Sequence, residues 1–288
     1  MHDASKSLAA AISAYTIWGL LPIFWKLLQH VDAFTVAAHR VLWAAAFAAV
    51  WLLVTGRLAA LREAFLDPRK LRATLLAAVF IGANFVVFIW AVSNDRVTEV
   101  SLGYYINPLL NVFLGWLFLQ ERLRPAQWGA VLLAAVGVLS LVVLQGTMPW
   151  VALALAGCFG MYGLVRKTAP MRAMPGLAAE TLILAPVCLA YLALFTEAPL
   201  QDALGHGAGQ AGLLLLTGPA TAIPLFLFAY GARRLSLGVM GMLMYISPSI
   251  QLLLAVRLYG EPFALAQAVA FGCIWAAIAL FLWSGRRT

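Results

Sequence analysis

The chain has 288 residues, of which 64% are apolar and only 10% are charged, and its formal net charge is +8. Soluble domains carry about 25% charged residues, so this composition excludes both an ordinary soluble protein and a disordered chain. The positive charge does not indicate nucleic-acid binding, because the Lys and Arg residues lie mainly in short segments between long apolar runs.

Ten apolar runs fill almost the whole chain. A helix needs about 20 mostly apolar residues to cross a bilayer, and each run is close to that length. In chain order they span residues 8–28, 34–54, 71–92, 98–119, 126–144, 149–166, 176–195, 211–230, 237–258 and 264–284. Only the connections 55–70 and 196–210 are longer than a turn. The sequence therefore predicts an all-α integral membrane protein with ten transmembrane helices and no soluble domain.

Lys and Arg are distributed unequally between the two sides of this helical array. If the N-terminus is placed on one side, most of the 19 basic residues fall on that side, and Lys26, Arg96 and Arg257 fall on the other. Basic residues gather on the cytoplasmic face of a membrane, so both termini are predicted to be cytoplasmic. The basic connections are the second and fourth of the first half but the first and third of the second half, which indicates opposite orientations of the halves.

The two halves also resemble each other directly, at an offset of about 140 residues. Residues 105–108 (Tyr-Ile-Asn-Pro) match residues 245–248 (Tyr-Ile-Ser-Pro), and Glu121 matches Glu261. Each copy holds five helices, an odd number, so the second copy must be inverted. We predict a first repeat over 8–145 and a second, inverted repeat over 149–285. Inverted repeats let one site between them face either side of the membrane alternately.

Pro108 and Pro248 stand at matching positions inside the fourth and ninth runs. Proline removes a backbone donor and displaces the carbonyl four residues earlier, so both residues are expected to break their helices. Paired interruptions of this kind are typical of a transporter's midplane site, where the freed backbone groups face a wet cavity. The alternative is a pair of packing kinks that neighbouring helices satisfy, and the sequence leaves both open.

Ionisable residues lie inside the apolar runs, with His39 and Arg40 in the second run and Glu180 in the seventh. An ionised group in a span is costly unless it is paired or hydrated, so Arg40 and Glu180 are predicted to line the substrate pathway or a gate, toward opposite mouths. The alternatives are that Arg40 extends to the outer headgroups and that His39 is a hydrogen-bonded packing residue. Because histidine ionises near neutral pH, His39 is also a candidate for proton coupling, together with Glu180.

Further polar and aromatic residues complete the predicted substrate pathway, which comprises Arg40, Asn84, Trp90, Tyr105, Asn107, Glu180, Tyr245 and Ser247. Aromatic residues in a span pack against lipid or protein more often than they contact a substrate. Packing is therefore the alternative role for Trp90. Glu121 and Glu261 are interpreted as structural, because a carboxylate is unfavourable at the end of a helix. Each is expected to cap the helix that follows it or to pair with an arginine such as Arg122 or Arg257.

Small residues recur at close spacing in the fifth and tenth runs, at Gly129, Ala130, Ala134 and Gly137 and at Ala266, Ala270 and Gly272. Small residues at such spacing allow close helix contact. They join either the two halves of one chain or two copies of the chain in a homodimer.

Several longer motifs resemble one group of transporters. They are Ile17-Trp18-Gly19, His39-Arg40-Val41, residues 101–109 and residues 121–124 in the first half, with residues 162–167, Glu180-Thr181, Tyr245-Ile246 and residues 259–261 in the second. Over residues 8–285 the chain resembles the RarD proteins, from the EamA family of the drug/metabolite transporter superfamily. The resemblance implies two inverted EamA repeats, a location in the bacterial inner (plasma) membrane, and efflux or exchange of small metabolites, amino acids or drugs such as chloramphenicol. One departure is Phe85, where the family pattern leads us to expect tryptophan.

A secondary transporter that works by alternating access is therefore the leading hypothesis. The sequence has no Walker motif, so ATP is not expected to drive it directly, and no cofactor or metal is expected. Its predicted partners are a small-molecule substrate and the lipid bilayer. An intramembrane enzyme would need a nucleophile beside a base, or clustered metal ligands, whereas the four histidines and three cysteines are scattered. The alternative is a passive channel or a non-transporting membrane protein.

Overall fold

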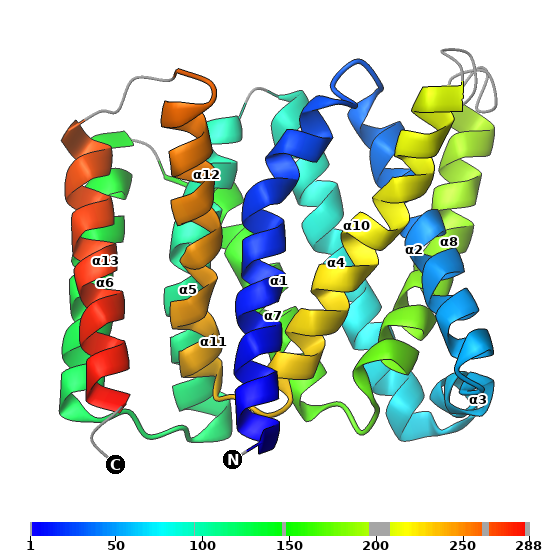
Figure 1. Ribbon diagram of the computed structural model, residues 1–288, viewed down its shortest axis with the longest axis horizontal. Coiled ribbons are helices and arrows are strands. Elements are labelled where there is room, and N and C mark those ends of the chain that lie inside the picture. Colours follow the sequence, from blue (N-terminus) through cyan, green and yellow to red (C-terminus); the bar gives the residue numbers. More distant parts are fainter. Residues whose placement is uncertain (1, 95, 146–147, 196–207, 261–264, 286–288) are drawn as a thin grey trace.

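The computed structural model describes residues 2–94, 96–145, 148–195, 208–260 and 265–285. Within these ranges every regular element is a helix (Figure 1), which confirms the predicted all-α class. The first half of the chain contains α1 (His2–Lys26), α2 (Ala33–Val54), α3 (Leu58–Leu66), α4 (Pro68–Ser93), α5 (Val97–Leu119) and α6 (Pro125–Gln145). The second half contains α7 (Trp150–Thr168), α8 (Ala173–Phe195), α10 (Ala208–Ala232), α11 (Leu237–Met244), α12 (Ile246–Arg257) and α13 (Leu265–Gly285).

The predicted apolar runs match these helices except in the connection 55–70 and in the ninth run. The connection contains the short helix α3, and α4 begins at Pro68, ahead of its predicted start. Asp67 explains the early start, because its carboxylate accepts hydrogen bonds from the backbone N–H groups of Arg69 (2.8 Å) and Lys70 (3.4 Å). The ninth run forms two helices, α11 and α12, which meet at Tyr245.

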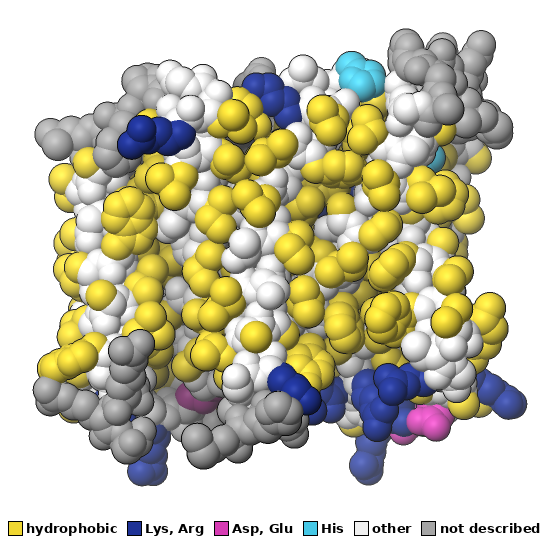
Figure 2. Space-filling view, in the orientation of Figure 1, with side chains coloured by type: hydrophobic (Ala, Val, Ile, Leu, Met, Phe, Trp, Pro, Cys, Tyr) yellow, Lys and Arg dark blue, Asp and Glu magenta, His cyan; other side chains and the backbone are white. Residues whose placement is uncertain are grey.

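Long apolar helices with apolar outer surfaces make up most of the molecule. In the described part of the chain, 9 segments are long and apolar enough to cross a membrane, with α11 and α12 counted together. α7 carries Arg166 and Lys167 in its last turn and is not among them, so the tenth span stays a prediction. Large apolar side chains such as Val79 and Leu194 are exposed, and Figure 2 shows such side chains across the middle of the molecule. The protein is therefore a multi-pass membrane protein.

The start of α1 and the end of α13 lie at the same end of the helical array (Figure 1), and Lys and Arg side chains gather there (Figure 2). We call this the basic end and the opposite one the distal end. The turn between α10 and α11 also lies at the basic end, where Gly231 approaches the Ser7 carbonyl of α1 and the Ala232 carbonyl accepts a hydrogen bond from Lys167 Nζ at 3.4 Å. Because α1 begins and α7 finishes beside this turn, the two helices run in opposite directions.

Most helix packing joins the two halves of the chain. α1 packs on α10 and α12, α2 packs on α8 and α10, and α4 packs on α7. α5 packs on α7 and α11, and α6 packs on α13. The apolar core is consequently shared between segments that lie far apart in the sequence.

The contact between α6 and α13 depends on small residues. A Cβ atom on Gly137 would lie 2.9 Å from the Ala270 carbonyl oxygen and 3.0 Å from Cys273 Cβ, so only glycine fits at this crossing. The small-residue faces of these helices thus join the two halves of one chain. A homodimer stays a prediction.

The prolines at matching positions have different effects. α5 continues through Pro108 as one helix, so the expected break at that residue is absent, whereas the helix near Pro248 is divided at Tyr245. The Tyr245 hydroxyl donates a hydrogen bond to the Tyr105 carbonyl at 3.2 Å, which satisfies a backbone group beside the residue that Pro108 disturbs. Gly241 permits this crossing, because a Cβ there would lie 2.5 Å from the Pro108 carbonyl oxygen.

Candidate functional site

A cavity of about 440 Å³ lies between helices of both halves, in the size range of small-molecule sites. Its wall is formed by the helices α1, α2, α4, α5, α7 and α10 and by the broken helix α11–α12. Most lining side chains are apolar or aromatic, and they include Trp18, Trp25, Phe85, Phe88, Leu155, Phe159, Leu225 and Met244. The polar lining residues include Lys26, Arg40, Asn84, Ser101, Asn107, Thr221, Ser247 and Gln251.

The cavity occupies the distal half of the helical array. Its lining extends along α1 from Tyr15 to Lys26, and along α5 from Val100 to Asn107. These stretches are the C-terminal half of α1 and the N-terminal half of α5. A molecule in the cavity would thus lie between the middle of the bundle and its distal end.

Arg40 lies on the cavity wall in surroundings that hold its side chain inside the protein. Its Nε donates a hydrogen bond to Thr221 Oγ1 at 3.2 Å. Its Cζ lies 4.5 Å from the centroid of the Trp25 ring and 5.3 Å from that of Phe85, within range of cation–π attraction. The side chain therefore packs among helices and does not extend to the lipid headgroups.

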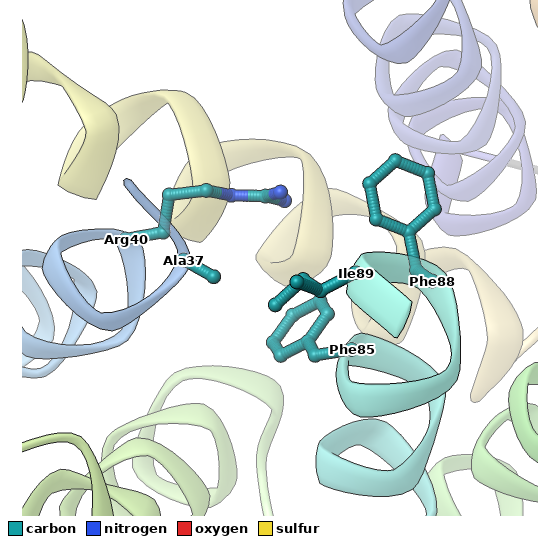
Figure 3. A pocket seen from close by; sticks show the side chains of 5 residues that line it. All are labelled: Ala37, Arg40, Phe85, Phe88 and Ile89. Carbon is teal, nitrogen blue, oxygen red and sulfur yellow. The ribbon is translucent and has the colours of Figure 1, made fainter. Parts of the chain in front are cut away.

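Figure 3 shows Arg40 and Ala37 of α2 facing α4 across a small recess of about 10 Å³. Phe85, Phe88 and Ile89 form the α4 side of this recess. Its volume is close to that of one water molecule, which needs about 10–15 Å³ on this measure. The guanidinium thus faces rings on one side and the open cavity on the other.

Amide and hydroxyl groups supply the remaining polarity of the wall. Asn84 Nδ2 donates to the Leu155 carbonyl at 3.0 Å. Gln251 Nε2 lies 3.4 Å from both Ser247 Oγ and the Trp18 carbonyl. Asn107 Oδ1 accepts a hydrogen bond from Asn111 Nδ2 at 2.9 Å. The predicted residues Arg40, Asn84, Asn107, Ser247 and Pro248 therefore come together around one cavity.

Other predicted pathway residues do not line this cavity. Trp90 packs against Trp150 with ring centroids 5.1 Å apart. Tyr105 and Tyr245 make the contact beside Pro108 described above, and both belong to a cluster that α6 and α13 cover. The Nε2 atom of His39 is buried and has no hydrogen-bond partner among the described residues.

Glu180 forms a buried ion pair near the basic end. Its Oε1 lies 2.7 Å from Arg166 Nη1, and the two side chains are each only 2% exposed. The Tyr162 hydroxyl donates to Glu180 Oε2 at 3.2 Å, and Arg166 Nη2 donates to the Ala173 carbonyl at 2.7 Å. This network ties the last turn of α7 to α8, nearer the basic end than the cavity.

Glu121 ties further helices together at the basic end. Its carboxylate accepts hydrogen bonds from the backbone N–H groups of Leu237 (2.8 Å) and Gly238 (3.1 Å), and Lys167 Nζ lies 3.6 Å from it. The structural role predicted for Glu121 is found, but the expected cap of the following helix is wrong, because the α5–α6 turn packs beside the start of α11. Glu261, its predicted equivalent, lies outside the described residues.

The turn after α10 adds positive charge to this end. Arg233 Nη1 donates to the Ala169 carbonyl at 3.4 Å. Partial burial, and then the neighbouring charges of Arg166, Arg234 and Arg172, lower the pKa of Arg233. The basic end is thus electropositive.

Sequence reasoning missed several wall residues, including Lys26, Thr221 and Gln251. A signal existed for Gln251, which follows Ser247 by one helical turn and so shares its face. Thr221 is the equivalent of Ile81 in the second repeat, and Ile81 also lines the cavity. Among the described residues, no group of three or more His, Cys, Asp and Glu side chains is arranged to hold a metal ion.

Comparisons with known proteins identify relatives of this chain. Residues 5–143 match the EamA-like transporter family. An uncharacterized transporter of Vibrio cholerae is 43% identical over 281 residues, which cover 97% of this chain and 93% of the relative. Protein RarD of Escherichia coli is 40% identical, over 96% of this chain and 95% of the relative. The chloramphenicol-sensitive protein RarD of Pseudomonas aeruginosa is 31% identical, over all of this chain and 97% of that one.

A solved crystal structure shares the fold. It covers 98% of this chain and 99% of its own, with a TM-score of 0.75 and 21% sequence identity. At this identity the likeness concerns the fold alone.

Proposed function

Because this chain belongs to the EamA-like transporter family and has RarD proteins among its relatives, we propose that it is a secondary transporter that exports or exchanges small metabolites, amino acids or drugs by alternating access. The observation that carries this proposal is the cavity of about 440 Å³ that helices of both halves enclose. A carrier site between two halves is the arrangement that alternating access requires. Relatives are named as transporters, which favours transport over intramembrane catalysis.

The proposed architecture is two inverted EamA repeats, over 8–145 and 149–285, that cross the membrane ten times. Residues at the repeat offset lie on the same cavity wall, as Trp18 and Phe159 do, and as Asn107 and Ser247 do. Helix packing shows the same correspondence between the halves, in which α1 is equivalent to α7, α4 to α10, and α5 to the α11–α12 pair. α4 packs on α7 just as α10 packs on α1, and α5 packs on α7 just as α12 packs on α1. The opposite directions of α1 and α7 also support an inverted second repeat.

We place the protein in the bacterial inner membrane with its basic end and both termini in the cytoplasm, following the distribution of Lys and Arg. The cavity then lies toward the outside, and the Arg166–Glu180 pair and the Lys167–Glu121 contact hold the cytoplasmic side together. Transport requires a second state in which this cytoplasmic network opens and the distal side closes. Glu180 acts as a gate residue in this scheme, whereas Arg40, Asn84, Asn107 and Ser247 face the substrate.

His39 and Glu180 are the proposed sites of proton coupling. The unpartnered Nε2 of His39 is the observation that favours it, since a buried imidazole without a hydrogen bond can gain one when its neighbour moves. A pH gradient across proteoliposomes should then drive uptake of substrate, and His39→Gln should abolish the drive while exchange continues.

Counterflow in proteoliposomes tests the function. A metabolite and drug screen by thermal shift first identifies ligands, and each is then loaded inside and supplied outside as a radiolabelled trace. A carrier gives saturable accumulation of the trace, which Arg40→Ala and Glu180→Gln should reduce without preventing membrane insertion. Unsaturable flux would identify a passive channel and a chemically altered ligand would identify an enzyme, and either result would overturn the proposal.

A further inference from the structure

We propose that the cavity selects small organic anions, with a carboxylate bound by the Arg40 guanidinium and an apolar body against the aromatic wall. This inference rests on the proposed transport function and names its substrate class. It depends on the charge of the wall, on the unused donors of Arg40, and on the apolar character of the surrounding rings.

The charge of the wall is entirely positive among the described lining residues. Arg40 and Lys26 line the cavity, and no Asp or Glu does. No described carboxylate oxygen lies within 4.0 Å of the charged nitrogen atoms of either residue, the distance that defines an ion pair. An uncompensated cation is unfavourable in a low-dielectric span, and a bound anion offsets that cost.

Arg40 keeps most of its donors available to a ligand. A guanidinium carries five N–H groups, and Arg40 uses Nε–H for Thr221, at 3.2 Å, but makes no hydrogen bond to a described residue through Nη1 or Nη2. Parallel N–H groups of this kind bind both oxygens of a carboxylate at once. The bond to Thr221 and the contacts with Trp25 and Phe85 fix the guanidinium before the ligand arrives.

The rest of the wall favours an apolar or aromatic body. Trp18, Phe88, Phe159 and Leu225 line the same cavity as Arg40, and the volume of about 440 Å³ admits a molecule of amino-acid to drug size. Asn107 and Ser247 also line this cavity and can bind a second polar group of the ligand. No carboxylate lines the described part of this cavity, whereas Arg40 and Lys26 do, so amines without an acid group are disfavoured.

The competing occupant with the same anionic chemistry is a lipid headgroup. Arg40 lies toward the start of α2, about 10 Å from that helix end at 1.5 Å per residue, which a phosphate could approach from the distal side. Trp25 and Phe85 stand against the guanidinium, however, and the free volume adjoins it on the cavity side. We therefore assign the site to a soluble acid and test the lipid directly.

Binding to three ligands with one body and different head groups tests the inference. Full-length protein in phosphatidylcholine nanodiscs is titrated near neutral pH with 3-phenylpropionate, 3-phenylpropionamide and 3-phenylpropylamine, by isothermal titration calorimetry. Charged hydrogen bonds contribute about 1.5–3 kcal/mol, so the acid should bind about 10–100-fold more tightly than the amide. The amine should bind most weakly.

Variants at Arg40 locate the preference. Arg40→Gln should remove the advantage of the acid while the amide still binds, and retained amide binding shows that the cavity is folded. Arg40→Lys keeps the charge but loses the paired donors, so the acid should lose affinity by a smaller factor. Arg57→Gln is the matched control, because Arg57 is exposed in the turn after α2 and far from the cavity lining.

Several outcomes would overturn the inference: equal affinities for acid and amide, tightest binding of the amine, no binding of any head group, or an acid preference that survives Arg40→Gln. Repeating the titration in phosphatidylglycerol nanodiscs tests the lipid. A loss of acid affinity of about tenfold there, beyond the loss that Arg40→Gln shows for the same change of lipid, would assign the site to a headgroup and overturn the soluble acid. Calorimetry needs no flux, so a protein that binds the acid but fails in counterflow refutes transport and leaves this inference standing.

Discussion

At the scale of single residues, Glu180 differs from every other carboxylate described here, because it and its partner Arg166 are almost completely removed from water. Charges in such a position are stabilised only by each other and by their hydrogen bonds, so loss of one leaves the other buried and unpaired. We expect Glu180→Gln to lower the free energy of unfolding by about 3–5 kcal/mol. Thermal unfolding of purified protein in detergent measures this change.

Controls for that experiment are built into the chain. Arg166→Met combined with Glu180→Leu removes both charges, and we expect this double variant to be more stable than Glu180→Gln alone. The exposed pair of Lys70 and Glu63, whose side chains are 21% and 62% accessible, gives the surface reference. Glu63→Gln should cost far less than Glu180→Gln, because water screens an exposed pair, and equal losses at Glu63 and Glu180 would contradict the argument.

At the scale of helices, α11 depends on a carboxylate from a distant part of the sequence. Glu121 accepts the first free N–H groups of α11, while Ser236 caps the same helix locally by accepting from Val239 N at 3.1 Å. Loss of a cap costs about 0.5–2 kcal/mol, and Glu121 also holds Lys167 near the same turn. Glu121→Ala should therefore destabilise the protein more than Ser236→Ala in the same unfolding assay. If Ser236→Ala is the more destabilising variant, the contact of Glu121 with Lys167 of α7 adds nothing to the stability of the protein.

The junction of α5 with α11 and α12 yields a second prediction for helices. Tyr245→Phe removes the hydroxyl that bonds the Tyr105 carbonyl, and this partly buried carbonyl then lacks that donor, at a cost of about 1 kcal/mol. Tyr105→Phe is the matched control, since it changes the ring substituent but keeps the carbonyl. Neither residue lines the cavity, so ligand affinity by calorimetry should stay within about twofold of the parent for both variants. A large change in affinity for Tyr245→Phe would bring this residue into the substrate pathway.

Most helices could be predicted from the sequence, because a long apolar run surrounded by lipid has no other way to satisfy its backbone. α3 escaped prediction because a short helix at the membrane end has no such run. The division at Tyr245 and the continuity at Pro108 depend on which helices meet there, which proline spacing does not encode. Local sequence therefore fixes where helices occur, while their breaks are settled by packing between the halves.

The candidate site was only partly predictable for a related reason. Arg40, Asn84, Asn107 and Ser247 stand out as polar residues in apolar runs, and the structure gathers them around the cavity. Aromatic residues are common in membrane helices, so no pattern separates the cavity-lining Phe88 from residues that pack elsewhere. Glu180 has the same sequence signature as Arg40, and only its contact with Arg166 distinguishes a buried ion pair from a cavity residue.

At the scale of the whole molecule, the inverted architecture makes a prediction about the connections that follow α1 and α7. Gln29 and Pro170 are equivalent in the repeat, and both are exposed. If the second repeat is inverted, these residues lie on opposite sides of the membrane, with Gln29 outside and Pro170 in the cytoplasm. Two copies in the same orientation would place them on one side.

Labelling of single cysteines in cells shows on which side of the membrane each of these residues lies. Cys158, Cys188 and Cys273 are first replaced by alanine, and Gln29→Cys, Pro170→Cys or Arg57→Cys is then introduced. A membrane-impermeant maleimide should label Gln29→Cys in intact cells, and should label Pro170→Cys and the cytoplasmic control Arg57→Cys only after permeabilisation. Charge in the connections and packing between the halves independently lead to this pattern, so labelling of Gln29→Cys and Pro170→Cys from one side would contradict both. Such a result would also remove the basis for a cavity that faces the two compartments in turn.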